Sequence, residues 1–321
     1  MIVFTEADPP QDGGYEHLDH ISDMHRMAME FARCGWEVVH IPKEYACADD
    51  LEAVFSGVTE RTEPTRALWS GYVPSQAHYE AVYRHLQQKN IYLPNPPEAH
   101  QEIMELDRSL RCLGELTAES VVIERESATS EQAPTFEDVV ARLGLPLFLK
   151  GAVFSQKDEG WGGCVATTLA ELREKVERFP TRLSRGRVIA RKLLPLKKNG
   201  ETLGGFPIAR EFRFFLWRGE ILAYGFYWAF GDTAFITLSP EEEKQVLALV
   251  QEAARRFQAA YLTLDVGQTE DGAWWVIESG DPQFAGLSHI PMETLIERLT
   301  LSMREPPPVS IGFHHEKDGR T

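Results

Sequence analysis

Three acidic residues near the carboxyl end of the 321-residue chain could hold a metal ion. Asp271-Gly272 is a strong type I′ turn pair, and a two-residue turn there places Asp265 directly opposite Glu278 on antiparallel strands. Their Cβ atoms would lie roughly 5 Å apart among apolar neighbours, where two like charges are unfavourable unless a cation neutralises them. Asp281 follows Glu278 closely and can reach the same point. Oxygen donors without sulfur or imidazole favour Mg²⁺ or Mn²⁺ over zinc; the alternative is a hairpin whose acids point to solvent.

Basic residues concentrate between positions 181 and 218, in a chain whose net charge is −16. They are Arg182, Arg185, Arg187, Arg191, Lys192, Lys197, Lys198, Arg210, Arg213 and Arg218. Such runs usually form solvated surface. However, residues 210–217 form a predicted strand in which each face carries an arginine, and the buried one needs an anionic partner. Because a metal held by carboxylates usually serves a phosphate, the same anion could bind these cations.

A lysine stands at the entrance of a Gly-rich segment. Lys150 ends an apolar strand and is followed by a predicted flexible loop over residues 151–163. A lysine in this place can bind phosphates while the loop closes over them. The segment lacks Gly-Lys-[Ser/Thr], so it is not a Walker A loop, and a lysine at a strand end is more often structural or solvated.

The elements that must position these residues fall into successive units. Strand–helix alternation over residues 1–105 predicts a Rossmann-like α/β domain with a small parallel sheet. A helix over residues 98–116 leads into an α+β unit, 106–190, that contains the Gly-rich loop. Residues 191–305 form a second α+β unit that contains the acidic hairpin, and 306–321 are expected to be a weakly ordered tail.

Composition excludes several classes of protein. Apolar residues make up 43% and charged residues 26%, as in globular proteins, and every apolar stretch is too short to span a membrane. The amino-terminal residues lack the basic and apolar regions of a signal peptide. Four cysteines without a Cys-x-x-Cys motif favour the reducing cytoplasm. The negative net charge disfavours bulk nucleic-acid binding.

In this order the elements resemble the ATP-grasp superfamily, in particular stand-alone bacterial and phage ATP-grasp proteins of unassigned substrate. The segments that carry the resemblance are LFLKG at 147–151, IARKLL at 189–194, EFR at 211–213, LDVG at 264–267 and VIESGD at 276–281. The resemblance implies an α+β ATP-grasp fold of two lobes, preceded by a pre-ATP-grasp domain. ATP would bind between the lobes.

The resemblance also implies roles for single residues. Phosphates would contact Lys150 and, in the Gly-rich loop, Ser155 and Lys157. The backbone of an inter-lobe hinge, made by Arg191, Lys192, Leu193 and Leu194, would meet the adenine. Arg213, with Arg210 nearby, would stabilise the transferred phosphoryl group, and Asp265, Glu278 and Asp281 would hold Mg²⁺. Gln283, Ser288 and His289 are candidates for the acceptor side, although each is more often an ordinary loop residue.

The implied activity is that of an ADP-forming ligase. It would use ATP and Mg²⁺ (or Mn²⁺) to join a small-molecule or peptide carboxylate to an amine through an acyl phosphate. The alternatives are an ATP-dependent phosphotransferase and a non-catalytic ATP-binding regulatory protein. A zinc site at His17, His20 and His25 is disfavoured, because these spacings spread the imidazoles around a helix. The sequence identifies neither the acid nor the amine, and an oligomer is possible.

Overall fold

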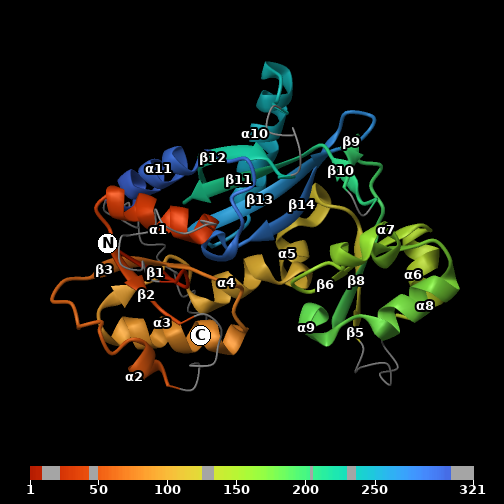
Figure 1. Ribbon diagram of the computed structural model, residues 1–321. Coiled ribbons are helices and arrows are strands. Elements are labelled where there is room, and N and C mark those ends of the chain that lie inside the picture. Colours follow the sequence, from red (N-terminus) through yellow and green to blue (C-terminus); the bar gives the residue numbers. More distant parts are fainter. Residues whose placement is uncertain (9–21, 43–49, 125–133, 203–204, 230–235, 305–321) are drawn as a thin grey trace, which may run out of the picture.

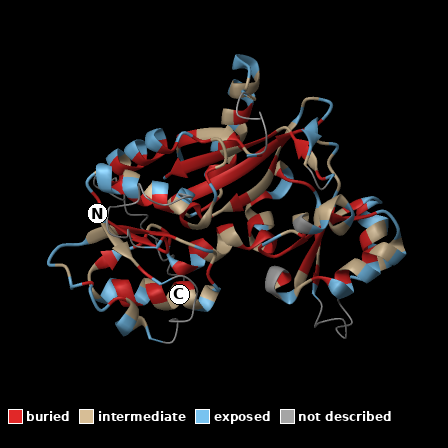
Figure 2. Ribbon diagram, in the orientation of Figure 1, coloured by how far each residue is buried: buried red, intermediate tan, exposed pale blue. Residues whose placement is uncertain are grey.

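The computed structural model describes residues 1–8, 22–42, 50–124, 134–202, 205–229 and 236–304. Three four-stranded sheets organise them, and Figure 1 shows the parallel sheet of the amino-terminal domain on the left with two antiparallel sheets above and to the right. Most strand residues are buried, whereas the outer faces of the helices are exposed (Figure 2). Within the described residues, none of the helices is both long enough and apolar enough to cross a membrane.

The amino-terminal domain is a parallel sheet of order β2-β1-β3-β4, as the strand–helix alternation predicts. Its elements are β1 (Ile2–Thr5), α1 (Asp23–Arg33), β2 (Glu37–His40), α2 (Leu51–Val54), β3 (Thr65–Ser70), α3 (Gln76–Gln88) and β4 (Ile91–Tyr92). Ser75 caps α3 by accepting a hydrogen bond from the His78 backbone N–H. Gly35 ends α1 with a φ of 82°, the left-handed conformation expected there.

Two helices, rather than the single predicted one, connect this domain to the rest of the chain. They are α4 (Pro97–Met104) and α5 (Leu106–Leu113), separated by Glu105 in an extended conformation. The Glu105 carboxylate is 2% exposed and forms ion pairs with Arg185 and Arg187, both at 2.8 Å. Burial opposes its ionisation, yet the hydrogen bonds from these arginines and Gln101 lower the pKa of Glu105 to about 2. Helical periodicity carries no information about these distant partners.

The small lobe is an antiparallel sheet of order β5-β8-β6-β7. Its elements are β5 (Ser120–Glu124), α6 (Phe136–Leu143), β6 (Leu147–Gly151), α7 (Gly160–Cys164), β7 (Val165–Ala166), α8 (Leu169–Arg178), α9 (Thr181–Ser184) and β8 (Arg187–Lys192). Thr135 and Asp138 form the predicted capping box of α6. The Gly-rich segment is partly helical, since it contains a 3₁₀ turn, η4 (Lys157–Glu159), and α7.

The large lobe is an antiparallel sheet of order β12-β11-β13-β14. Its elements are β11 (Glu211–Trp217), β12 (Glu220–Phe226), α10 (Pro240–Ala254), β13 (Tyr261–Gln268), β14 (Trp274–Gly280), η6 (Pro282–Phe284) and α11 (Met292–Arg304). A separate hairpin, β9 (Lys198–Glu201) with β10 (Pro207–Ala209), precedes them. Arg218 and Gly219 both have positive φ at the predicted tight turn.

The two faces of the large-lobe sheet have different partners. Alternate residues of β11, including Phe212 and Phe214, pack in the cluster that contains the α10 residues Val246 and Val250. Phe215, on the opposite face, packs in the cluster that contains α11. Strand alternation places Glu211 and Arg213 on this second face, beyond the end that α11 covers. That uncovered end faces the small lobe.

The acidic hairpin has the predicted pairing for a different reason. Asp265 does lie opposite Glu278, but the loop spans three residues between Thr269 and Ala273. A β-bulge at Ile277 shifts the register by one residue and compensates for the longer loop. The predicted two-residue turn is therefore wrong, whereas the cross-strand pair is confirmed.

Candidate active site

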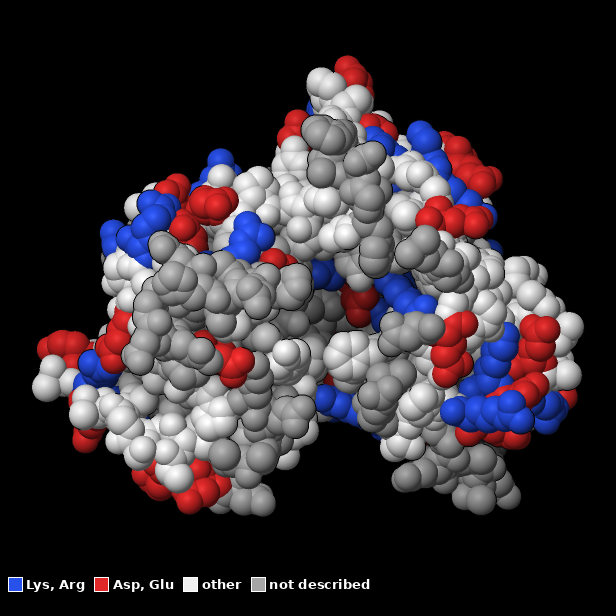
Figure 3. Space-filling model, viewed as in Figure 1, with Lys and Arg blue, Asp and Glu red and all other residues white. Residues whose placement is uncertain are grey.

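A cavity of about 450 Å³ lies between the small-lobe and large-lobe sheets. Figure 3 shows a hollow in the middle of the molecule with acidic and basic atoms at its bottom. Apolar side chains form much of the wall: Phe148, Trp161, Leu193, Leu194, Phe206, Trp228 and Ile277. Charged residues also line it: Lys150, Lys157, Arg191, Lys192, Lys198, Glu211, Glu270 and Glu278. The cavity therefore combines an apolar slot with a charged end, as small-molecule sites do.

Lys150 crosses from the small lobe toward the large lobe. Register in β6 places it opposite Ile189 of β8. Its Nζ lies 2.5 Å from a Glu278 carboxylate oxygen, and the residue is 4% exposed. Burial lowers the pKa of Lys150 despite this carboxylate. The predicted phosphate lysine and one predicted metal ligand are thus brought together as an ion pair.

Lys157, from the Gly-rich segment, is held by aromatic rings of the large lobe. Its Nζ lies 4.9 Å and 4.8 Å from the ring centroids of Tyr227 and Trp228 and 3.4 Å from the Tyr227 hydroxyl. Burial opposes the charge, but Tyr227 and Glu211 favour it, so the pKa of Lys157 lies above its usual value. Trp161 of α7 packs on Phe206 beside this contact. The segment is therefore closed over the cavity, and Ser155 lines it as well.

Arg191 ties the hinge to the bulge of β14. Its Nη1 donates to the Ile277 carbonyl at 2.8 Å and its Nη2 to the Thr117 hydroxyl at 2.7 Å. The Thr117 hydroxyl in turn donates to the Val276 carbonyl. Burial lowers the pKa of Arg191 to about 10. The side chain thus stabilises the backbone just before Glu278, and the next three hinge residues line the cavity.

Arg213 and Asp265 form a bidentate pair on the uncovered face of the large-lobe sheet. Nε and Nη2 of Arg213 each donate to an Asp265 oxygen at 2.8 Å, and Nη1 donates to the Gly286 carbonyl at 2.8 Å. Burial opposes the charge, but Asp265 raises the pKa of Arg213 above its usual value. Arg213 is therefore fixed between an acidic strand and the loop that follows β14.

Glu211 is a further acidic residue of the cavity, and the sequence analysis did not list it as a site residue. It is 6% exposed, and its carboxylate has no hydrogen-bond partner within the described ranges. Burial, with Asp265 nearby, raises the pKa of Glu211 to about 7. Strand alternation from Arg213 was the pattern that could have identified it, because both residues share one face of β11.

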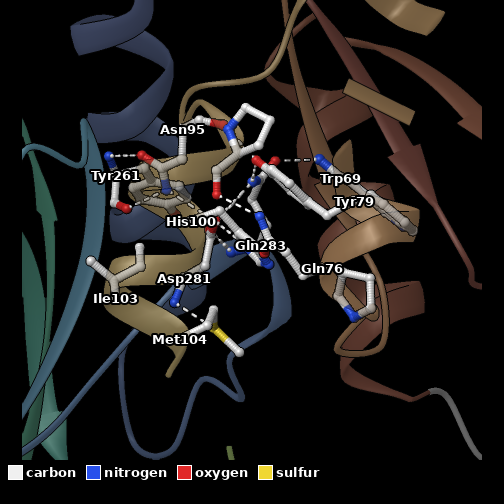
Figure 4. A network of polar contacts seen from close by, with 12 residues as sticks. Trp69, Gln76, Tyr79, Asn95, His100, Ile103, Met104, Tyr261, Asp281 and Gln283 are labelled. Atoms are coloured by element: carbon white, nitrogen blue, oxygen red, sulfur yellow. Dashed lines mark hydrogen bonds and ion pairs between the residues drawn. The ribbon is translucent and has the colours of Figure 1, made fainter. Parts of the chain in front are cut away.

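Asp281 does not join Asp265 and Glu278, which corrects the predicted acidic trio. It lies at the junction with the amino-terminal domain, 1% exposed, where its Oδ2 lies 3.0 Å from His100 Nδ1 and accepts a hydrogen bond from Asn95 (Figure 4). The chain turns at the end of β14 and enters η6, which carries the side chain away from the cavity. Among the residues that the structure describes, no three His, Cys, Asp or Glu side chains form a metal-binding group.

Three other residues also differ from expectation. Arg210 points to the opposite face of the sheet and pairs with Glu242 of α10 at 2.7 Å. Gln283 is buried in the junction with the amino-terminal domain rather than on the acceptor side. His25 lies on α1 with its ring nitrogen 2.7 Å from Ser22 Oγ, while His17 and His20, like the tail 306–321, fall outside the described residues.

The comparisons with known proteins agree with this architecture. Residues 155–299 match the model of an ATP-grasp domain family, which is described as family 3 of its clade. No curated protein sequence matches the chain. The ATP-grasp fold class and the predicted superfamily resemblance are thereby confirmed.

Solved structures extend the likeness over most of the chain. D-alanine–D-alanine ligase from Bacillus anthracis is 15% identical with a TM-score of 0.57, covering 94% of this chain and 97% of that one. A RimK domain ATP-grasp protein from Sphaerobacter thermophilus is 14% identical, with a TM-score of 0.58 and coverages of 94% and 99%. N5-carboxyaminoimidazole synthase from Aspergillus clavatus, in complex with ADP and 5-aminoimidazole ribonucleotide, is 13% identical, with a TM-score of 0.60 and coverages of 95% and 77%. At these identities the likeness concerns the fold.

Proposed function

Because this chain is an ATP-grasp protein in its fold and in its family match over residues 155–299, we propose that it is an ATP-dependent ligase that joins a carboxylate to an amine. The observation that carries the proposal is the inter-lobe cavity, into which cations from both lobes project beside Glu211 and Glu278. Similar structures include D-alanine–D-alanine ligase and D-cycloserine synthetase. The acid and the amine of this protein are not assigned.

The cavity suits a nucleoside triphosphate. We place the base in the apolar slot between Phe148 and the hinge residues Leu193 and Leu194, where a flat ring excludes water. Lys150 and Lys157 lie at the charged end, where they would neutralise the phosphates. Lys150 must exchange Glu278 for a phosphate oxygen when the nucleotide binds.

The acidic residues fit Mg²⁺ only together with the nucleotide. Asp265 and Glu278 face each other across β13 and β14, but each is already paired with a cation of the chain. Mg²⁺ commonly takes one or two carboxylates and completes its coordination with water and substrate phosphates. We therefore assign Asp265 and Glu278 as its protein ligands. When bound, the ion would neutralise charge on the phosphates.

The proposed reaction has two displacements. A carboxylate oxygen of the substrate attacks the γ-phosphorus of ATP, the bond to the bridging oxygen breaks, and ADP leaves. The amine nitrogen then attacks the acyl carbon, phosphate departs with the bonding electrons, and the nitrogen loses a proton. Lys150, Lys157 and Arg213 stabilise the negative charge that moves between these groups. The Gly-rich segment, held closed by Lys157 and Trp161, would exclude water from the acyl phosphate.

A trapping assay separates this activity from its alternatives. The protein is incubated with Mg-ATP, a panel of amino acids, peptides and other carboxylates, and hydroxylamine, and the products are read by mass spectrometry. A ligase forms a hydroxamate and ADP, a phosphotransferase forms a stable phosphorylated product, and a regulatory protein leaves ATP intact.

The matched variants in this assay are Glu278→Gln and Glu270→Gln, both in residues that line the cavity. Glu278→Gln should lower hydroxamate formation by about 100-fold or more, because it removes an Mg²⁺ ligand and the partner of Lys150. Glu270→Gln should retain activity within a few fold. Wild-type activity in Glu278→Gln would contradict the assignment of Glu278.

A further inference from the structure

The segment that leaves β14 is anchored in the amino-terminal domain (Figure 4). Asp281 accepts a hydrogen bond from Asn95 at 3.0 Å and lies 3.0 Å from the ring nitrogen of His100. Its second oxygen accepts from the Gln283 backbone N–H at 3.1 Å and caps η6. Asn95 also pairs with the Tyr261 backbone through both its side-chain oxygen and its nitrogen. The anchor is therefore buried and joined to two strands of the large lobe.

Gln283 completes the open edge of the parallel sheet. The outer strand β4 pairs only with the first two residues of β3, which leaves the rest of that edge without a strand neighbour. The Gln283 side-chain oxygen accepts from the Trp69 backbone N–H at 2.9 Å, and its carbonyl accepts from the Gly71 N–H at 3.2 Å. Its side-chain nitrogen lies 3.2 Å from the Tyr79 hydroxyl. A buried N–H without a partner is unfavourable, so the edge of β3 requires this residue.

The other end of the same segment reaches the active site. Arg213 donates to the Gly286 carbonyl at 2.8 Å, and the His289 backbone N–H donates to the Phe226 carbonyl at 3.1 Å. The segment also passes very close to β12, since a Cβ added at Gly225 would lie 2.6 Å from the His289 carbonyl oxygen. Residues 281–289, called here the anchored loop, thus run from the amino-terminal domain to Arg213.

We propose that Gln283 and Asp281 are positioning residues for the reaction, because they fix the anchored loop that orients Arg213. This inference rests on the proposed function, in which Arg213 stabilises the transferred phosphoryl group. Neither residue touches the cavity; each acts through the loop. The amino-terminal domain is then part of the catalytic framework in addition to any part it has in substrate binding.

A purely structural role makes a different prediction, and the same interface offers a control. Trp36 of the amino-terminal domain donates through its indole N–H to the Thr300 hydroxyl of α11 at 2.8 Å, and both residues are buried. Thr300→Val weakens the contact between the two domains without touching the anchored loop. If the junction only holds the domains together, Thr300→Val and a Gln283 variant of equal thermal stability should behave alike.

The test compares Gln283→Met, which keeps the side-chain length but removes the amide, with Thr300→Val and the wild type. ADP formation is measured in the hydroxylamine assay at varied ATP, and backbone hydrogen exchange is measured over residues 284–291. Gln283→Met should lower kcat by about tenfold or more, leave KM for ATP within about twofold, and speed exchange in the loop. Thr300→Val should leave all three unchanged.

The outcomes are distinguishable. Unchanged kcat in Gln283→Met, or equal kcat losses in Gln283→Met and Thr300→Val, would overturn the positioning role. If Gln283→Met does not fold, Asp281→Asn replaces it; this variant keeps a capping oxygen but removes the charge beside His100, and a smaller kcat loss with faster loop exchange is expected. A wild-type protein that forms no ADP with any acid would refute the proposed function, and the positioning role with it.

Discussion

The large lobe has two boundaries of opposite character. Toward the amino-terminal domain, Asn95, His100 and Asp281 are at most 2% exposed and bonded to one another or to backbone groups. Toward the small lobe lies the cavity, where Glu211 lacks a hydrogen-bond partner within the described residues and single ion pairs such as Lys150–Glu278 cross the gap. The first boundary is suited to hold a fixed geometry, and the second to open, accept a charged ligand and close again.

The difference follows from how each boundary satisfies its polar groups. At the junction, Gln283 takes the place of a missing strand neighbour, so removing it leaves buried backbone N–H groups unpaired. In the cavity, the contacts of Lys150 and Arg213 are with carboxylates, and phosphate oxygens offer the same chemistry. A ligand can therefore replace contacts in the cavity but not in the junction.

The largest expected effect separates the cavity from the rest of the large lobe through two neighbouring arginines. Arg213→Lys keeps the charge beside Asp265 but loses the bidentate geometry and the bond to Gly286, so kcat for hydroxamate formation should fall about 100-fold. Arg210→Lys makes the same change at the Glu242 pair on the opposite face and should keep kcat within about threefold. Equal losses in the two variants would mean that the face of the strand does not matter.

A smaller effect concerns the pH dependence of stability in the nucleotide-free protein. Burial raises the pKa of Glu211 to about 7, against 4.5 ordinarily, so the protonated acid favours the folded state. This contribution is complete below pH 4.5 and is lost as the pH rises through 7. Glu211→Gln cannot ionise, and its advantage over the wild type in free energy of unfolding should grow between pH 5 and 8, to about 3 kcal/mol.

Denaturant unfolding at several pH values measures this difference. Glu270→Gln is the control, because Glu270 is an exposed acid at the rim of the same cavity. Its stability should follow that of the wild type at every pH. Parallel curves for Glu211→Gln and the wild type would show that the Glu211 carboxylate is not held in a costly environment.

Local sequence patterns predicted what depends on neighbours along the chain. Strand–helix alternation predicted the parallel sheet, and the caps at Thr135 and Ser75 lie where their side chains accept hydrogen bonds. The opposition of Asp265 and Glu278 was also predicted, although two offsets, a longer loop and a bulge, had to cancel. Such compensation is not visible in a turn motif alone.

The remaining features depend on partners far apart in the chain. Asn95 bonds to Tyr261, and Glu105 breaks a predicted helix because Arg185 and Arg187 bind it. Asp281 was misplaced because its position three residues after Glu278 says nothing of the turn into η6. Hydrophobic periodicity reports burial, but it does not report which polar group satisfies which.

The central claim is that a nucleotide binds between the two antiparallel sheets with its phosphates on Lys150. Calorimetric titration with Mg-ATP tests it most directly, using the wild type, Lys150→Met and Lys244→Met, the last at an exposed lysine of α10. The wild type and Lys244→Met should bind with equal affinity, and Lys150→Met about 10- to 100-fold more weakly, since a charge-assisted bond to phosphate is lost. Absence of binding to the wild type, or equal affinity in Lys150→Met, would contradict the claim.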